Sequence, residues 1–157
     1  MKKKEVLIIA PHCDDEIIGC YEVLKKHKSI IIYTEEADTK RKEEAKNLRK
    51  YIDIKSQLFL RTIPESFINK DTTLYFPDPI NEIHHAHRLQ GIVGEQLVRA
   101  GLDVIFYSVN MLAPYCHEVE NSVEKEKVLN SVYPSQSDLW KYDKRYILFE
   151  GRCKWIL

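Results

Sequence analysis

The fold of this chain is most constrained by a regular alternation of short apolar runs with longer segments that have helical periodicity. The short runs predict strands, and helical segments between successive strands favour a mainly parallel sheet with helices on its faces. The runs are almost wholly apolar, as is typical of strands buried on both sides. We therefore predict an α/β fold. Its strands are expected over Glu5–Ala10, Ser29–Thr34, Ser56–Leu60 and Val104–Val109, with late candidates over Tyr146–Phe149 and Cys153–Ile156.

The ends of the helices are predicted from residues that can cap them and from the spacing of apolar side chains. Together with the strands, these helices indicate a Rossmann-like arrangement. Residues 61–80 contain three prolines and have no clear period, which predicts a long functional loop. Helices are expected from Asp14 or Asp15 to about His27, from Thr39 to Tyr51, from about Ile80 to Ala100 with Gly101 just beyond the end, and from Asn121 or Ser122 onward.

Length and charge limit the functions that the chain can perform. A length of 157 residues corresponds to one domain, which we place over residues 1–157. The 24 basic residues balance the 24 acidic ones, so the chain lacks the excess of positive charge expected of a dedicated nucleic-acid binder. No apolar run approaches the roughly 20 residues of a membrane span, and Val6–Ala10 predicts a strand rather than a signal peptide. The sequence is compatible with a homo-oligomer.

The four cysteines are few for a disulfide framework and include no Cys-x-x-Cys pair. We therefore expect reduced thiols in a cytoplasmic protein. Cys116-His117 has no partner at metal-binding spacing, so a loop or a strand end is the expected setting of this pair.

A histidine and three carboxylates crowd the end of the first predicted strand. The segment reads Ala10-Pro11-His12-Cys13-Asp14-Asp15-Glu16. Open α/β sheets bind ligands at the carboxyl ends of their parallel strands, so this position favours a functional site. Asp14 and Asp15 can alternatively serve only as helix caps at the positive end of the helix dipole, but that reading leaves His12 unexplained.

Three of the six histidines fall within four positions, in His84-His85-Ala86-His87. On a helix, His84 and His87 share one face while His85 points ~100° away. Histidine pairs often only cover a helix surface, and that alternative applies if the cluster stands alone. Together with the strand-end cluster, however, histidine and aspartate can form a three-ligand metal site with one open position. Such a site suits a hydrolytic metal, with a spare carboxylate as the base and a spare histidine as the oxyanion donor.

Four motifs resemble those of a known family. Pro11-His12-Cys13-Asp14-Asp15-Glu16, followed by Gly19, is similar to the Pro-His-Pro-Asp-Asp-Glu motif of the LmbE-like, or PIG-L, family of zinc-dependent N-acetylglucosaminyl deacetylases. His84-His85-Ala86-His87 resembles the second motif of that family, His-Pro-Asp-His. Two shorter matches are Arg41 with Glu44, which resembles Arg-x-x-Glu, and Tyr133-Pro134-Ser135-Gln136, which resembles Tyr-x-Ser-Gln. The four motifs follow the order of the family.

The resemblance implies a single LmbE/PIG-L-like deacetylase domain that binds Zn²⁺ or another divalent transition metal. The shorter matches have alternatives: Arg41 and Glu44 can form an ion pair on a helix surface, and residues 133–136 can be an ordinary turn. The roles implied by the resemblance are metal ligands at His12, Asp15 and His87, a general base at Asp14, an oxyanion stabiliser at His84 and a substrate contact at Arg41.

The chain departs from the family pattern only at positions that supply no metal ligand. Cys13 replaces a proline, His85 and Ala86 replace the Pro-Asp of the second motif, and the glycine after the second strand is absent. Cys13 is expected to be a small buried residue, with a competing thiolate ligand or an oxidation-sensitive neighbour as the alternatives. The chain is also short for the family, so the loops that define a large substrate are reduced.

The leading hypothesis is a cytoplasmic metal-dependent hydrolase that removes the acetyl group from an N-acetylated amino sugar of the N-acetylglucosamine type, or from a conjugate of one. An alternative keeps the metal but acts on a non-sugar amide, such as an acylated nucleoside or a small amine. A metal-containing binding module without turnover is disfavoured, because Asp14 and His84 serve catalysis rather than ligation. A magnesium phosphotransferase ranks lower, since imidazoles suit zinc better than magnesium.

Overall fold

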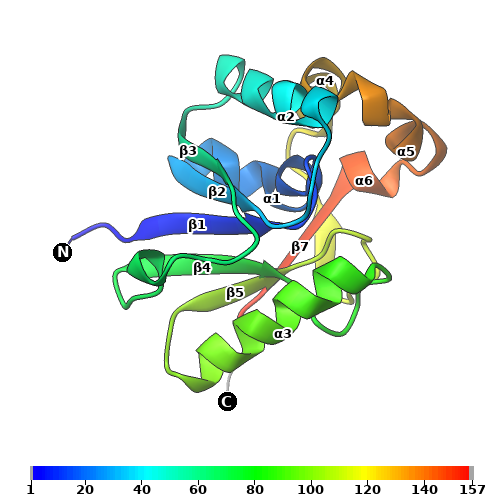
Figure 1. Cartoon of the computed structure of the whole chain (residues 1–157). Coiled ribbons are helices and arrows are strands. Elements are labelled where there is room, and N and C mark those ends of the chain that lie inside the picture. The colour runs from blue at the N-terminus through cyan, green and yellow to red at the C-terminus, as the bar shows by residue number, and fades with distance from the viewer. Residues whose placement is uncertain (1, 156–157) are drawn as a thin grey trace.

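The computed structural model describes residues 2–155, which form a single α/β domain around a seven-stranded sheet (Figure 1). The first five strands are parallel, whereas β7 runs antiparallel to β5 and β6 runs antiparallel to β7. The predicted α/β class with a mainly parallel sheet is therefore confirmed. Across the sheet the order is β3 (Ile54–Phe59), β2 (Ser29–Tyr33), β1 (Glu5–Ala10), β4 (Thr72–Pro77), β5 (Val104–Tyr107), β7 (Phe149–Cys153) and β6 (Cys116–Glu118).

Helices cover both faces of this sheet. Figure 1 shows α3 on one face, and α1, α2, α4, α5 and α6 gathered on the other. The α-helices are α1 (Asp15–Lys26), α2 (Thr39–Lys46), α3 (His85–Arg99), α4 (Ser122–Val132), α5 (Ser137–Tyr142) and α6 (Arg145–Leu148). Short 3₁₀ helices are η1 (Asn47–Lys50), η2 (Glu65–Phe67) and η3 (Pro134–Gln136).

The strand order creates a switch point between β1 and β4. From β1 the chain moves outward through β2 to β3, and it then returns to form β4 on the other side of β1. The connections that leave β1 and β4 therefore diverge, and this is the place where open α/β sheets bind their ligands. Because α1 follows β1 and α3 follows β4, both helices begin beside this point (Figure 1).

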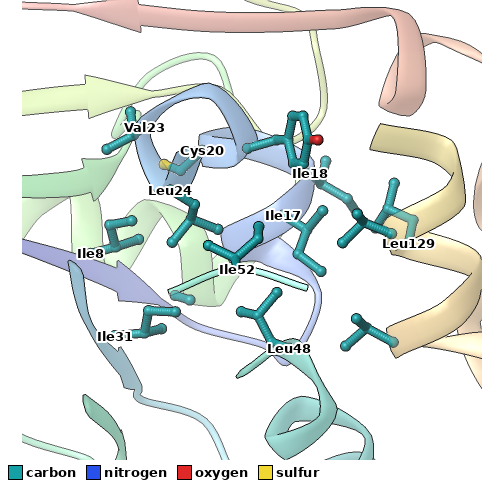
Figure 2. Packing of buried hydrophobic residues seen from close by; sticks show 14 of the residues in the cluster. Ile8, Ile17, Ile18, Cys20, Val23, Leu24, Ile31, Leu48, Ile52 and Leu129 are labelled. Carbon is teal, nitrogen blue, oxygen red and sulfur yellow. The ribbon is translucent and has the colours of Figure 1, made fainter. Parts of the chain in front are cut away.

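Two hydrophobic cores lie on the two faces, because alternate side chains of a strand point in opposite directions. Ile8 of β1 belongs to the core that contains Leu24 of α1 and Leu129 of α4, and Figure 2 shows this packing around α1. Ile9, the next residue of β1, belongs to the other core, against which Leu97 of α3 packs. The central strands are thus buried on both faces, as their apolar sequences predict.

A glycine allows α1 to pass close to β5. A Cβ atom at Gly19 would lie 2.4 Å from the ring of Tyr107, so no larger residue fits there without a shift of the ring. That ring is fixed, since the Tyr107 hydroxyl donates to the backbone oxygen of Ile9 at 2.6 Å. α1 is therefore held at Gly19 against the ends of β1 and β5.

The prediction of one long loop over residues 61–80 is wrong. The segment contains η2 and β4, and β4 is a central strand that pairs with both β1 and β5. Proline suggests a loop because it lacks a backbone N–H, but Pro77 is the last residue of β4. Asp78 follows Pro77, and its backbone N donates to the backbone oxygen of Tyr107 at 2.8 Å. Pairing with β5 therefore extends past the proline.

The third predicted helix begins at His85 rather than near Ile80. Asp78 holds the preceding residues in a turn, since its carboxylate accepts from the backbone N of Ile80 at 2.6 Å and of Asn81 at 2.9 Å. Side-chain acceptors of this kind compete with helical hydrogen bonding. His84 is therefore the residue that precedes α3 and is not part of its first turn.

The predicted caps of the two polar helices have different outcomes. α2 is capped by Asp38 rather than Thr39, because the Asp38 carboxylate accepts from the backbone N of Arg41 at 2.8 Å. The helix also gives way to η1 before residue 51. The prediction for α4 is confirmed: the Asn121 side chain accepts from the backbone N of Glu124 at 3.1 Å.

The late strand candidates are only partly correct. Residues 145–148 form the short helix α6, and β7 begins at Phe149. The candidate over Cys153–Ile156 overlaps β7 at Cys153 alone, and Ile156 lies outside the described residues. β7 and its partner β6 form an antiparallel edge that the sequence pattern did not predict.

The cysteines are all free thiols, as expected. Burial raises the pKa of Cys13 to about 12, with Glu16 adding to the effect, so this side chain is a neutral, buried thiol rather than a thiolate ligand. Cys116 and His117 lie in β6. Within residues 2–155, no helix has both the length and the apolar character needed to cross a bilayer.

Candidate metal centre

The carboxyl end of β1 turns directly into α1 and brings His12 and Asp15 together. Asp15 is the first residue of α1, and its Oδ2 accepts from the backbone N of His12 at 2.7 Å. The same oxygen lies 3.2 Å from His12 Nδ1. Asp14 occupies the N-cap position, but its side chain accepts no helix hydrogen bond. Asp14 therefore forms no side-chain cap, whereas Asp15 lies in the first turn, at the positive end of the helix dipole, as the alternative expects.

His87 reaches this pair from the first turn of α3. Its Nε2 lies 3.0 Å from Asp15 Oδ2 and 3.2 Å from His12 Nδ1. Two imidazole nitrogens and one carboxylate oxygen thus form a triangle with edges of 3.0, 3.2 and 3.2 Å. Asp15 and His87 are buried, and His12 is partly open to solvent. The strand-end cluster and the histidine cluster therefore converge at the switch point between β1 and β4.

The triangle fits a divalent metal ion. Ligand atoms held tetrahedrally at ~2.0–2.1 Å from zinc are about 3.3 Å apart, which is close to the edges observed here. Two nitrogens and one oxygen suit zinc or another transition metal better than magnesium or calcium. In the part of the chain that the structure describes, this is the one group of three or more such side chains whose ligand atoms converge. His12, Asp15 and His87 can therefore hold a metal ion and leave one position for water or substrate.

The charges of the triangle support one another. Burial disfavours the ionised form of Asp15, but the adjacent His87 and His12 outweigh it and hold the pKa of this carboxyl well below its usual range. Burial likewise disfavours a charged His87, but Asp15 and Glu82 raise its pKa to about 10. Asp15 is therefore a stable buried anion, and its negative charge favours a cation at this point.

Asp14 lies beside the triangle with an unusual backbone conformation. Its φ of 122° falls where non-glycine residues rarely occur, and such strain is common at functional sites. Arg41 Nη2 lies 3.4 Å from Asp14 Oδ2. Burial and the charge of Asp15 raise the pKa of Asp14 well above its usual range, while Arg41 lowers it. A buried carboxyl with a raised proton affinity suits proton transfer.

Glu16 links the strand-end cluster to the late motif. Its Oε2 accepts from the backbone N of Asp14 at 2.9 Å, which supports the strained turn. Its Oε1 accepts from the hydroxyls of Tyr33, at 2.8 Å, and Tyr133. Burial raises the pKa of Glu16 to about 7, although the two hydroxyls oppose the shift. Residues 134–136 form the turn η3 after α4, as the alternative expects, and Tyr133 is in addition a buried partner of the first motif.

The two shorter motifs are joined in the structure. Arg41 Nη2 donates to the backbone oxygen of Cys13, beside Asp14. Glu44 accepts from the backbone N of Ser135 at 3.1 Å and from its hydroxyl at 2.6 Å. Arg41 and Glu44 therefore contact different partners, and the alternative of a surface ion pair between them is wrong.

His84 lies next to the triangle although it precedes α3. Its ring centroid is 4.5 Å from that of His12 and 5.2 Å from that of His87. Burial lowers the pKa of His84, and the charges of His12 and His87 lower it further. A neutral imidazole keeps one N–H donor, which an oxyanion requires. The predicted convergence of His84 and His87 is thus observed, although the two residues do not share a helix face. His84 and His85 are both exposed to solvent, but only His84 contacts the triangle.

A cavity of about 240 Å³ adjoins the triangle. It is bordered by all six residues to which the sequence assigns a role, so they face one shared space. A larger hollow of about 400 Å³, beside the second half of α1, contains none of them. The remaining wall of the 240 Å³ cavity consists of Ile18, Val109, Asn110, Gln136, Leu139 and Tyr146.

Sequence reasoning missed Glu82, which contacts His87 at the ring nitrogen that faces away from the triangle. This carboxylate is fully buried, and its Oε1 lies 3.0 Å from Nδ1 of His87. In the sequence, Glu82 is one of many acidic residues and stands in a polar segment without periodicity. Only its position two residues before His84 could have drawn attention to it.

Comparisons with known proteins add no assignment. Neither a model of a known family nor a curated protein matches this sequence. The resemblance to the LmbE-like family therefore rests on the motifs quoted above.

Proposed function

We propose that this chain is a zinc-dependent deacetylase of the LmbE-like kind, which removes the acetyl group from an N-acetylated amino sugar or from a conjugate of one. The observation that carries the proposal is the convergence of His12, Asp15 and His87 at the switch point, with Asp14 and His84 on the same cavity. The free cysteines fit a cytoplasmic setting. The motif resemblance supports the choice of reaction.

His12, Asp15 and His87 would hold the zinc ion, which when bound supplies a Lewis acid and lowers the pKa of water. Their arrangement is prepared by the fold. The backbone N of His12 orients Asp15 through a 2.7 Å hydrogen bond, and the start of α3 fixes His87. Such preparation reduces the reorganisation that the site needs when the reaction occurs.

Asp14 acts as the general base in this proposal. Its carboxylate borders the cavity, accepts a proton from the attacking water and returns it to the nitrogen of the departing amine. Arg41, 3.4 Å away, stabilises the ionised form that begins the cycle, while burial and Asp15 increase the affinity for the proton. The opposing effects keep both protonation states accessible.

His84 donates a hydrogen bond to the carbonyl oxygen as negative charge develops on it. Its lowered pKa keeps the ring neutral, and the ring lies 4.5 Å, centroid to centroid, from that of His12. The donor therefore stands beside the metal ligands, where the carbonyl of a bound amide would lie.

The small cavity restricts the part of the substrate that is enclosed. A volume of about 240 Å³ accommodates an acetamido group and the adjoining part of one sugar ring. Arg41 and Gln136 on its border offer donors for sugar oxygens. A larger conjugate would extend beyond this cavity into solvent.

The experiment that tests this proposal is an assay of the zinc-loaded protein. It is incubated with N-acetylglucosamine, its nucleotide-linked and lipid-like conjugates, acetylated nucleosides and simple N-acetyl amines, and both acetate and free amine are measured. Equal release of acetate and amine from an amino sugar, absent in Asp14→Asn, supports the proposal. Release only from nucleosides or simple amines would replace the substrate, and no release from any member of the panel would overturn the reaction.

A further inference from the structure

Glu82 occupies a position that neither the motif resemblance nor the metal triangle explains. It lies in the segment between β4 and α3, and its side chain is fully buried. An isolated buried carboxylate is costly, so each of its oxygens needs partners. Those partners come from two different parts of the fold.

One set of partners is the backbone that follows β5. Glu82 Oε1 accepts from the backbone N of Val109 at 3.1 Å, and Oε2 accepts from that of Asn110 at 3.1 Å. Asn110 returns the contact, because its side-chain oxygen accepts from the backbone N of Ile83 at 3.0 Å. Val109 and Asn110 both border the cavity. The Glu82 carboxylate therefore fixes part of the cavity wall.

The other partner is His87. Glu82 Oε1 lies 3.0 Å from His87 Nδ1, on the side of the ring opposite to the triangle, while His87 Nε2 lies 3.0 Å from Asp15. In the neutral, metal-ligating form of His87, a proton on Nδ1 lies beside the Glu82 carboxylate and leaves Nε2, which faces the triangle, as a lone pair. Partners of this kind set the ring orientation and the basicity of metal-ligating histidines.

We propose that Glu82 is a positioning residue that fixes His87 as an Nε2 metal ligand and ties this ligand to the Val109–Asn110 wall of the cavity. The inference rests on the metal site of the proposed function, but not on the reaction or its substrate. Glu82 would thus strengthen metal binding through His87, without touching the metal itself.

Zinc binding by variants tests the proposal. Glu82→Gln keeps the size of the side chain, but it removes the charge and replaces one acceptor oxygen with a donor NH₂ group. Zinc affinity, measured by competition with a chromogenic chelator, should fall by about 10-fold to 100-fold, as is usual when such a partner is lost. Substitution of cobalt should also give an altered absorption spectrum, because the geometry of the His87 ligand changes.

Asp78→Asn is the matched control. Asp78 is also a buried carboxylate in the segment between β4 and α3, and it also accepts from two backbone N–H groups, of Ile80 and Asn81, but it does not contact His87. We expect its zinc affinity to stay within about 2-fold of that of the wild type, although its melting temperature should fall. Equal losses of zinc affinity in Glu82→Gln and Asp78→Asn would overturn the proposal, because both would then report only a loosened loop.

A measurement on the wild type covers the case in which Glu82→Gln does not fold. In the zinc-loaded protein, the Nδ1 proton of His87 should give a downfield NMR signal that exchanges slowly with water. A signal that exchanges as quickly as that of exposed His85 would overturn the proposal. A wild type that binds zinc with full affinity but releases no acetate would leave this inference standing and overturn only the reaction, whereas a wild type that binds no zinc would overturn both.

Discussion

Two clusters of buried charge lie against α1, and their atoms are arranged in opposite ways. Where α4 meets β7, Lys125 Nζ donates to the backbone oxygens of Ile18 and Phe149, at 2.6 and 3.1 Å, and lies 3.5 Å from Glu150. Arg152 also contacts Glu150, at 3.1 Å. Opposite charges meet directly among Lys125, Glu150 and Arg152, so these charges balance one another without any ligand. We call this group the closed cluster.

The metal triangle instead turns two imidazole nitrogens toward each other. His12 Nδ1 and His87 Nε2 face each other at 3.2 Å, and both face one oxygen of Asp15. Nδ1 of His87 faces away from the triangle and lies beside Glu82, and the Asp15 oxygen that belongs to the triangle also accepts from the backbone N of His12. Two imidazole nitrogens and one carboxylate oxygen that converge on one point can hold a cation, whereas a cluster of paired opposite charges stabilises the fold without one.

The largest effect that this comparison predicts is the loss of metal from ligand variants. His12→Ala and His87→Ala should each lose the one divalent ion per chain, because two ligands cannot hold it at a site designed for three. Elemental analysis after gel filtration measures the content. Lys125→Met should keep a full equivalent of metal. Full occupancy in both histidine variants would exclude the triangle as the binding site.

The next effect separates the neighbouring aspartates. Asp14→Asn should keep its metal but lose about 10²-fold to 10⁴-fold in kcat, which is the usual contribution of a positioned general base. Asp15→Asn should weaken metal binding first, because Asp15 and not Asp14 supplies an oxygen to the triangle. Metal titrations and steady-state kinetics on the same two preparations provide the test. Exchanged phenotypes would mean that the two carboxylates have the opposite roles.

Lys125→Met tests the closed cluster. It removes the cation from a buried pair and leaves two backbone oxygens without a donor. We expect the free energy of unfolding to fall by about 3 kcal/mol, at the lower end of the range for one broken partner because Arg152 stays on Glu150. Urea denaturation measures the change. The double variant with Glu150→Gln should recover part of the loss, and a Lys125→Met protein as stable as the wild type would show that the lysine contributes nothing.

A smaller effect is expected at His84. His84→Ala should keep metal and substrate binding but lose about 10²-fold in kcat, the scale observed when an oxyanion donor is removed. His85→Ala is the control, because His85 is exposed like His84 but lies outside the cavity border. Steady-state kinetics on the two variants decide between the roles. A silent His84→Ala together with an inactive His85→Ala would mean that the ring nearest to His12 is not the donor.

Local sequence was sufficient to predict the part of the site that follows β1. His12 and Asp15 are three residues apart, and the strand before them is a plain apolar run, so the turn between strand and helix brings them together. The sheet edge on which they lie also follows from the alternation of strands and helices. No long-range contact had to be known for this step.

The positions of His84 and Glu82 could not be predicted in the same way. Histidine spacing suggested one helix face, but the Asp78 turn delays the start of α3, and His84 reaches the triangle from outside the helix. Glu82 acquires its role only when β5 lies beside β4 and brings the backbone of Val109 within 3.1 Å. Both features depend on contacts between segments that the chain order does not reveal.

The smallest predicted effect is the pH dependence of the stability that Glu22 contributes at the edge of the closed cluster, where it contacts Arg152. Glu22 is partly buried, which opposes its ionisation, but hydrogen bonds from Arg152 at 2.8 Å and His117 at 2.9 Å lower its pKa to about 2. Because the pKa of the folded state lies below the ordinary value of ~4.3, the stabilisation is complete above that value and is lost as the pH falls toward about 2. Solvent reaches both partners, so we expect about 1 kcal/mol rather than the full value implied by the shift.

Thermal melts of the wild type and of Glu22→Gln between pH 6 and ~2 measure this contribution. The difference in melting temperature should be largest at pH 6 and should shrink below ~4.3, where the wild-type carboxylate begins to lose its advantage. Zinc must be absent from both samples, since acid also protonates the ligands of the triangle and would add a second transition. A difference that stays constant over the whole range would show that Glu22 stabilises the fold by packing alone, and that the closed cluster ends at Arg152.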